Sequence, residues 1–166
     1  PNEWRLYQHL GYIYWKLKRY DEAAETYAKG SEIGGSSPFM KMMSAAMRTE
    51  GGSRGTSRAI YAQMLADAQD EQVAITAKRR LMQLDSLDDR EAIDKALADF
   101  KEKNGRCANS FGEIGGVLTQ LKLPEDRMLK IDSSRRLVDP SDAPYLLDKD
   151  TCKAKLDPEK TTIALQ

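Results

Sequence analysis

The sequence predicts a mainly α-helical protein, with antiparallel helical hairpins over residues 1–103 and a small α+β module over residues 104–166. Two observations predict the helical part. Apolar residues recur at steps of three and four, and glycine-containing segments end some of these stretches, at residues 34–35, 51–57 and 105. A third observation predicts the module, because after Gly105 the pattern changes to short apolar segments between Pro and Asp.

The composition fits one helix-rich domain or two small ones, since 40% of the 166 residues are hydrophobic and 31% are charged. Lys+Arg and Asp+Glu both number 26, so no net field attracts nucleic acid. No apolar run approaches the length of about 18 residues that a transmembrane helix needs. The chain begins at Pro1 without an initiator Met or an apolar leader, so we expect a fragment or processed form, and whether a targeting segment precedes residue 1 stays open.

The first hairpin is predicted by residues that share one helical face: Trp4, Tyr7, Leu10, Gly11, Tyr14 and Leu17. Gly11 is unfavourable inside a helix by about 1 kcal/mol relative to Ala, so its presence predicts the close approach of a second helix. That helix begins near Tyr20, has acidic residues in its first turn and ends at Gly34-Gly35. We expect Ala23 to face Gly11.

The same residues form a spacing that is typical of one repeat family: Tyr7-x-x-Leu10-Gly11-x-x-Tyr14, followed by Ala23-x-x-x-Tyr27. This spacing resembles the tetratricopeptide repeat (TPR), with Tyr7 in the usual Trp place. The resemblance implies a right-handed solenoid of helix pairs that acts as a binding scaffold without chemistry of its own. Gly30 replaces the usual Ala and Gly35 the usual Pro, which loosens the expected junction to the next pair.

The middle of the chain predicts further helices. Met40, Met43 and Met47, with Ser44, repeat the pattern of the first helix, and a long loop follows at residues 51–57. A helix over about residues 58–68 should turn five residues inward: Ile60, Tyr61, Met64, Leu65 and Ala68. We expect another helix over about residues 71–84 and a last one that the capping box Asp88-x-x-Glu91 opens and that ends near residue 103. Residues 4–103 would then form three helix pairs.

The C-terminal module is predicted to contain a short helix over residues 111–120 and strands at residues 144–148 and 161–165, with Leu137-Val138 as a third candidate. Three segments carry a weak resemblance to the periphery of type II secretion pseudopilins: residues 104–110, Leu121-x-Leu123-Pro124 and Asp139-Pro140-x-x-x-Pro144-Tyr145. Asp142 stands where that family has Gly, and Ala108 where Pro is common. We transfer no secretion function from this resemblance.

Cys107 and Cys152 are the only cysteines, and two interpretations stay open. They are free thiols in a cytosolic protein, or they form one disulfide that ties the first loop of the module to its strands. The disulfide, which we favour, would stabilise by roughly 3–5 kcal/mol and would imply an oxidising compartment such as the periplasm or envelope. Neither zinc-ligand spacing nor a Cys-x-x-Cys motif is present, so no metal or cofactor is predicted.

Other side chains that could act in catalysis or ligand binding lack the partner residues that such a site requires. His9 is the only histidine and has no Ser or Cys at a fixed spacing. Asp148-x-Asp150 begins like a calcium loop, but the Gly and the closing Glu are missing. The basic run at residues 78–80 is too short to bind nucleic acid in a neutral chain. The sequence therefore predicts no catalytic residue and no enzyme.

The aromatic residues indicate a binding face. Seven of the 12 lie between Trp4 and Tyr27, and Tyr12 and Trp15 point away from the core-facing stripe. In TPR proteins the first helix of each pair lines the ligand-facing surface. The resemblance places five residues there: Arg5, Gln8, Tyr12, Trp15 and Lys16. A rigid aromatic pair beside hydrogen-bond donors suits a peptide-binding hot spot. In the alternative, Trp15 packs on the second hairpin or on a repeat before residue 1.

We therefore expect a non-catalytic adaptor that binds a peptide or protein on the concave face of its helices. The alternative is an assembly subunit of a bacterial envelope or secretion complex, in which the module docks against a neighbouring copy or the complex. Self-association stays open in both cases. Nucleic acid is not an expected partner.

Overall fold

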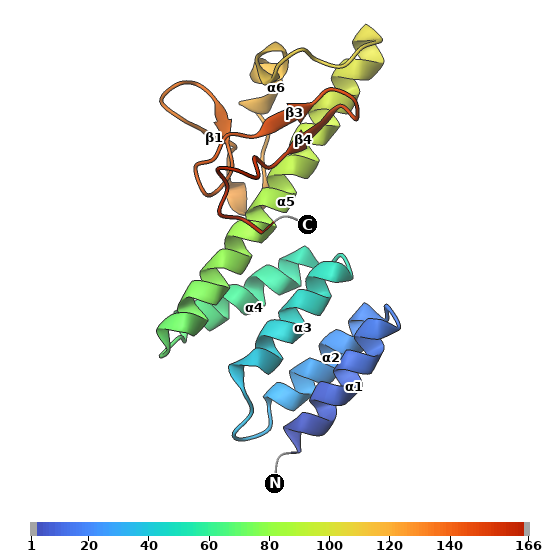
Figure 1. The fold of residues 1–166 in the computed structure, drawn as a ribbon, viewed down its shortest axis with the longest axis vertical. Helices are drawn as coiled ribbons and strands as arrows, with labels where there is room; N and C mark the ends of the chain where they lie inside the picture. The colour runs from blue at the N-terminus through green and yellow to red at the C-terminus, as the bar shows by residue number, and fades with distance from the viewer. Residues whose placement is uncertain (1–2, 165–166) are drawn as a thin grey trace. The chain divides into compact units, whose positions relative to one another are not determined.

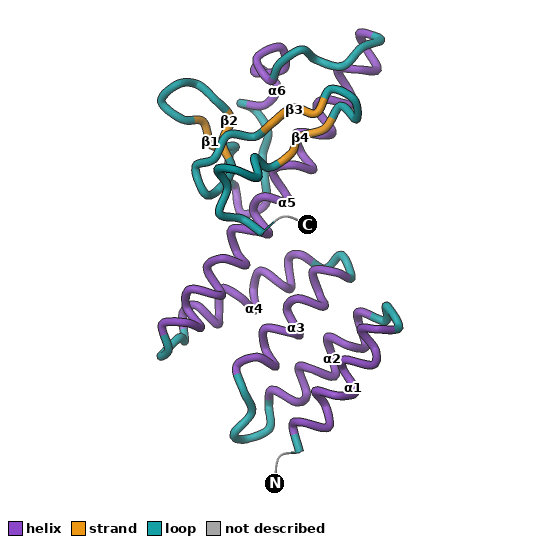
Figure 2. Tube along the Cα trace, viewed as in Figure 1, coloured by secondary structure: helices purple, strands orange, loops and turns teal. Residues whose placement is uncertain are grey.

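The computed structural model describes residues 3–164 and is mainly helical, with two small β-hairpins (Figure 1; Figure 2). The chain divides into two compact units, residues 1–81 and residues 82–166. The division falls inside one helix, whereas the sequence suggested a boundary after residue 103.

Unit 1 consists of helices that pack in chain order, α2 on α1, α3 on α2 and α4 on α3 (Figure 1). The bounds of its complete helices are α1 Trp4–Lys16, α2 Tyr20–Ser31, α3 Pro38–Glu50 and α4 Arg54–Ala66. The start of α3 follows local rules, because the Ser37 side chain accepts a hydrogen bond from the Phe39 amide and Pro38 occupies the first turn.

The contact between α1 and α2 explains Gly11. A Cβ atom at Gly11 would lie 2.8 Å from the ring of Tyr27, so only glycine allows this approach without a shift. The three nearest atoms all belong to the Tyr27 ring, one turn after Ala23, the residue that we expected to face Gly11. Ala23 and Ala24 are fully buried in the same cluster.

The second hairpin differs in detail from a repetition of the first. The Met40 methyl group and the Tyr7 Cβ occupy the space that a side chain at Gly30 would need, so this face of α3 meets α2. On α4, the Ser57 hydroxyl donates to the Ala45 carbonyl at 2.8 Å and the Tyr61 hydroxyl donates to the Met42 carbonyl at 3.3 Å. α3 is therefore covered on separate sides by α2 and α4. Leu65 is 36% exposed, so its predicted inward position is wrong.

The expected third helix pair does not form, because α5 runs without interruption from Glu71 to Asn104. The predicted break near residues 85–87 contains neither Gly nor Pro. Ser86 and Asp89 are buried along the continuous helix, so the Asp88-x-x-Glu91 pattern lies in a helix interior and caps nothing. Two hairpins and one long helix replace the three predicted pairs.

Unit 2 packs short elements against the C-terminal part of α5. Its helical turns are η1 Phe111–Ile114, α6 Gly115–Leu118 and η2 Pro124–Asp126, and its strands are β1 Lys130–Ile131, β2 Leu137–Val138, β3 Leu146–Asp148 and β4 Lys153–Lys155. β1 pairs with β2 and β3 with β4, both antiparallel, with Lys130 opposite Val138 and Leu146 opposite Lys155.

Several details of the predicted module are corrected. The helix expected at residues 111–120 splits into η1 and α6. The strand expected at residues 161–165 is absent over residues 161–164, and Leu165 lies outside the described residues. β1 and β4 were not predicted.

The core of unit 2 joins α5 to these segments. It combines helix residues with residues from the loops and hairpins, among them Ile93, Leu97, Leu137, Tyr145, Leu156 and Ile163. The Ala154 amide also donates to the Asp94 side chain at 2.7 Å, which anchors β4 on α5. The chain thus buries this helix face with short irregular elements rather than with another helix.

Candidate functional site

The candidate site is the face of α1 that carries Tyr12, Trp15 and Lys16. The rings of Tyr12 and Trp15 lie with their centroids 5.6 Å apart and tilted by 60°. The Lys16 Nζ lies 5.4 Å from the Tyr12 centroid and 4.9 Å from the Trp15 centroid. One cation therefore covers two aromatic rings.

Helical spacing explains this arrangement. Residues three and four apart on a helix are neighbours on its surface, so Tyr12, Trp15 and Lys16 meet on one side of α1. Gln8 precedes Tyr12 by one turn, and Arg5 lies one turn earlier, where its guanidinium sits 5.5 Å from the Trp4 ring. The sequence prediction placed these side chains on one helix, and their neighbouring positions follow from its period.

The two aromatic residues differ in exposure. Tyr12 is 48% exposed, whereas Trp15 is partly buried against the cluster that includes Tyr27 and Met40. The expectation that both rings would be substantially exposed therefore holds for Tyr12 alone. Trp15 thus packs against the cluster and also lies beside Tyr12 and Lys16.

A groove that sequence analysis did not indicate lies along α2, α3 and α4. It consists of two adjoining cavities of about 390 and 370 Å³, whose shared wall includes Ser31, Lys41 and Met64. The smaller cavity has a mainly apolar lining that includes Ala59 and Ile60. We call the two cavities together the Lys41 groove. It brings together side chains from separate helices, and no local pattern predicts that.

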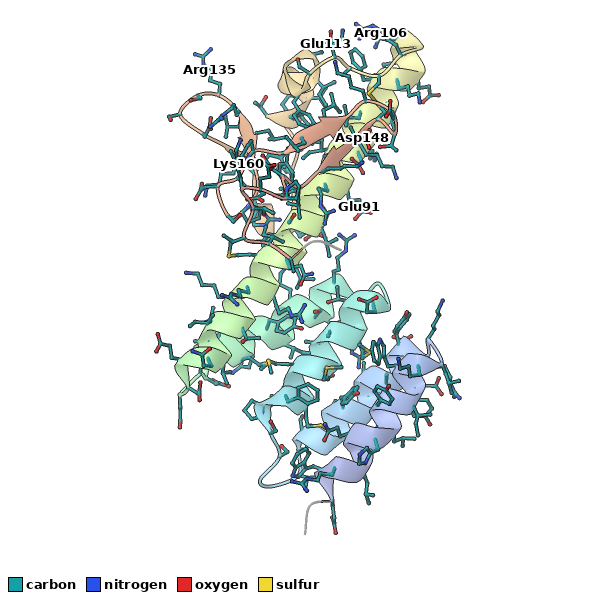
Figure 3. All side chains as sticks on the ribbon, viewed as in Figure 1. Glu91, Arg106, Glu113, Arg135, Asp148 and Lys160 are labelled. Atoms are coloured by element: carbon teal, nitrogen blue, oxygen red, sulfur yellow. A yellow bond between two sulfur atoms is a disulfide. The ribbon has the colours of Figure 1, made fainter. Side chains whose placement is uncertain are left out.

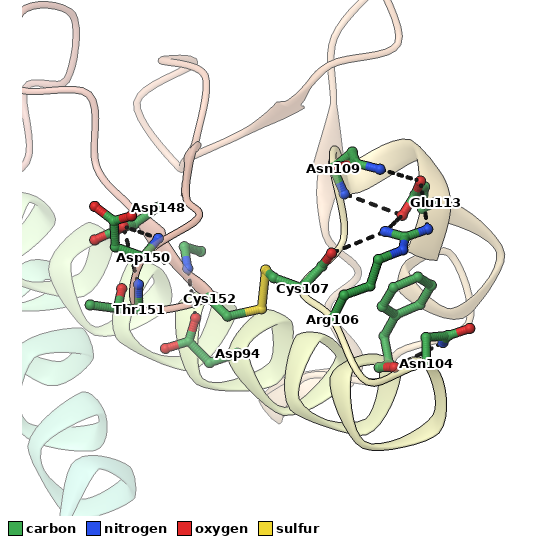
Figure 4. Close-up of a disulfide and its surroundings, with 12 residues drawn as sticks. Asp94, Asn104, Arg106, Cys107, Asn109, Glu113, Asp148, Asp150, Thr151 and Cys152 are labelled. Carbon is green, nitrogen blue, oxygen red and sulfur yellow. Dashed lines mark hydrogen bonds and ion pairs between the residues drawn. A yellow bond between two sulfur atoms is a disulfide. The ribbon is translucent and has the colours of Figure 1, made fainter.

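The cysteines of unit 2 form the disulfide that the sequence favoured. The Cα atoms of Cys107 and Cys152 lie 5.6 Å apart, and the bond ties the loop after α5 to the β3–β4 hairpin (Figure 4). Beside it, the Arg106 guanidinium pairs with Glu113 at 3.0 Å, and the two residues lie close together in Figure 3. This guanidinium and the Asn109 side chain lower the pKa of Glu113 to about 2.

Asp89 is the most perturbed buried carboxyl group in unit 2. It is 2% exposed, accepts a hydrogen bond from the Tyr145 hydroxyl at 3.2 Å and pairs with Arg127 at 3.2 Å. Burial raises its pKa to about 6, although Arg127 and Tyr145 act in the opposite direction. The group fastens two irregular segments to α5, and nothing in the sequence marked it.

The acidic residues that the sequence offered as candidates take part in turns and ion pairs. Within residues 3–164 no group of three or more His, Cys, Asp or Glu side chains could hold a metal ion. Asp148 accepts hydrogen bonds from the amides of Asp150 and Thr151 and pairs with Lys155, so its carboxylate shapes a turn. None of the described helices combines the length and the apolar character needed to cross a membrane.

Comparison with known proteins yields no match: no protein-family model fits the chain, and no curated protein or solved structure resembles it significantly. The proposals below therefore rest on the residues and their geometry.

Proposed function

We propose that the chain is a non-catalytic scaffold that binds a peptide or protein through the face of α1 formed by Arg5, Gln8, Tyr12, Trp15 and Lys16. The observation that carries this proposal is the exposed Tyr12 ring, which lies against Trp15 with Lys16 above both rings. The TPR resemblance of residues 4–35 supports the same face, since it assigns the first helix of a pair to the ligand.

The geometry favours a particular kind of ligand. Binding loses little conformational freedom at Tyr12, because Trp15 and Lys16 already restrict its ring. Preorganised aromatic side chains are typical of interaction hot spots. Arg5 and Lys16 supply charge-assisted hydrogen bonds, so we expect an apolar or aromatic ligand side chain next to a carboxylate.

The disulfide supports a location for this activity. Disulfides persist in oxidising compartments and are rare where glutathione and thioredoxin keep thiols reduced. With Cys107 and Cys152 joined, we propose that the protein works outside the reducing cytosol.

Selection of a ligand from a random peptide library displayed on phage, with the whole chain as target, tests the proposal. Tyr12→Ala should weaken binding of the selected peptide by at least about 2 kcal/mol, which is the loss expected at a hot spot. Phe39→Ala is the matched control, because Phe39 is an exposed aromatic residue of the same unit outside this face. Equal losses for the two variants, or a selection that enriches no peptide, would refute the proposal.

A further inference from the structure

A second face of α1, which Leu17 continues just after the helix, carries large apolar side chains that unit 1 leaves uncovered. The expected place of Leu10 and Leu17 on the core-facing side of the helix is therefore wrong. Leu6 is 70% exposed, Leu10 42%, Ile13 52% and Leu17 59%. At 3.6 residues per turn these four positions fall within an arc of about 60°, next to the Tyr12 face and away from Gly11. We call them the leucine stripe.

The spacing of the stripe is that of a coiled-coil seam. Its steps of four, three and four residues place Leu6 and Ile13 at heptad position d, and Leu10 and Leu17 at position a. A narrow stripe of this kind matches another helix rather than a broad globular surface. From Leu6 to Leu17 it spans about 16 Å, which corresponds to three turns of a partner helix.

The flanks of the stripe define the charge of the partner. His9 and Lys16 occupy the g positions, while the e positions hold Tyr7 and Tyr14, which pack against the core cluster. Lys16 is exposed, and neither flank offers a carboxylate at these positions. A partner helix with Asp or Glu opposite Lys16 would complement this edge, as e and g charges do in coiled coils.

A second copy of the chain lacks this complementarity. In an antiparallel pair the g edges of both helices face each other, which brings Lys16 and His9 against the same residues of the copy. In a parallel pair the g edge faces Tyr7 and Tyr14, which carry no negative charge. A pair of stripes would therefore bury its apolar residues without an ion pair.

A lipid surface also fits less well. Helices that lie in a membrane interface bury a wide apolar face and direct Lys and Arg outward to the headgroups. Here the apolar arc is one seam wide, and the cations of Arg5 and Lys16 lie over Trp4 and over the Tyr12–Trp15 pair. We propose that the leucine stripe docks an amphipathic helix of another protein whose flank is acidic.

Two synthetic peptides of about three heptads, with Leu at a and d, test this proposal. One has Glu and the other Lys at every e and g position, and fluorescence anisotropy measures their binding to the whole chain. We expect the Glu peptide to bind at least about tenfold more tightly than the Lys peptide. Lys16→Glu should reverse this preference.

Leu6→Asp and Leu10→Asp test the stripe itself, and each should lower the affinity for the Glu peptide at least about tenfold. Leu6 is the most exposed of the four, so Leu6→Asp keeps the test valid if Leu10→Asp perturbs folding, which circular dichroism checks. Leu65→Asp, at an exposed apolar residue of α4, is the matched control and should leave affinity unchanged.

Three results would overturn the proposal. The first is that neither peptide binds, or that both bind with equal affinities that Leu6→Asp and Leu10→Asp leave unchanged. The second is a dimer in sedimentation equilibrium that Leu6→Asp abolishes, which would identify a second copy as the occupant. The third is binding to phosphatidylglycerol vesicles, lost in Leu6→Asp, without binding of the Glu peptide.

Discussion

At the scale of single residues, two positions show how the backbone restricts the choice of residue: a close helix contact at Gly11 and a left-handed turn at Asp142. The hydrogen of Gly11 lets the Tyr27 ring lie against the backbone of α1. Asp142 adopts a φ of +70° in the turn where the pseudopilin-like pattern has Gly. Asp tolerates this left-handed region better than most residues, and the Asp139 side chain holds the turn by accepting from the Ser141 and Ala143 amides.

Gly11→Ala should lower the free energy of unfolding by about 1–3 kcal/mol, because the new methyl group would overlap the Tyr27 ring. Helix propensity alone predicts the opposite, a gain of about 1 kcal/mol. Gly55→Ala is the matched control, since Gly55 lies in α4 with nothing within 4 Å of its added Cβ. Urea unfolding measures both variants, and a Gly11→Ala protein as stable as wild type would contradict the packing described here.

Asp89 should make stability depend on pH. Its folded pKa of about 6 lies above the ordinary value of 3.8, so the folded state binds the proton more strongly than the unfolded state. This contribution is fully present below about pH 3.8 and is lost as the pH rises through about 6. The gap between the two pKa values corresponds to about 3 kcal/mol.

Asp89→Asn removes this titration, so its destabilisation relative to wild type should be larger at pH 4 than at pH 7 by about 2 kcal/mol, which is less than the full gap because pH 4 lies close to the ordinary pKa. Urea unfolding at the two pH values measures the difference. Asp99→Asn, which changes an exposed carboxyl group on the same helix, is the control for the removal of a carboxyl group from α5. A destabilisation by Asp89→Asn that is the same at both pH values would show that Asp89 does not titrate in this window.

At the scale of elements, the success of sequence prediction depends on how local the signal is. α1, α2 and α3 follow from apolar periodicity and from Gly11, which are both contained in short segments. The break expected in α5 was wrong because an Asp-x-x-Glu pattern occurs in helix interiors as well as at helix starts. Strands of two or three residues, such as β1 and β4, depend on distant partners and carry too little local pattern.

The same distinction applies to the site. Tyr12, Trp15 and Lys16 are neighbours through helical spacing, so the sequence could place them together. The Lys41 groove and the Asp89 cluster join residues from separate elements, which only tertiary packing brings into contact. The partial burial of Trp15 belongs to this second kind, since it depends on the cluster formed with α2 and α3.

The disulfide acts between elements, because it closes a loop across 45 residues of unit 2. The chain-entropy relation assigns about 4 kcal/mol to a loop of this length. Reduction of the wild-type protein should therefore lower the melting temperature of unit 2. The double variant Cys107→Ser, Cys152→Ala should melt at this lower temperature and show no further response to dithiothreitol. A wild-type melting curve that reductant leaves unchanged would contradict this role.

At the scale of the whole molecule, the chain combines two units with different means of stabilisation. Unit 1 relies on helix packing around a small cluster of Ala, Tyr and Met side chains. Unit 2 surrounds one helix with irregular segments that a disulfide, the buried Asp89 and the partly buried Asp94 hold in place. The exposed Tyr12 ring and the leucine stripe lie on unit 1, so we propose that recognition occurs on that unit.

The most direct test of this assignment is chemical-shift mapping of the whole chain by NMR during titration with the selected peptide. The scaffold proposal predicts the largest changes at the amides of Arg5, Gln8, Tyr12 and Lys16 and at the Trp15 indole N–H. Changes concentrated in the Lys41 groove, at Ile60 and Met64, or in unit 2 would contradict it.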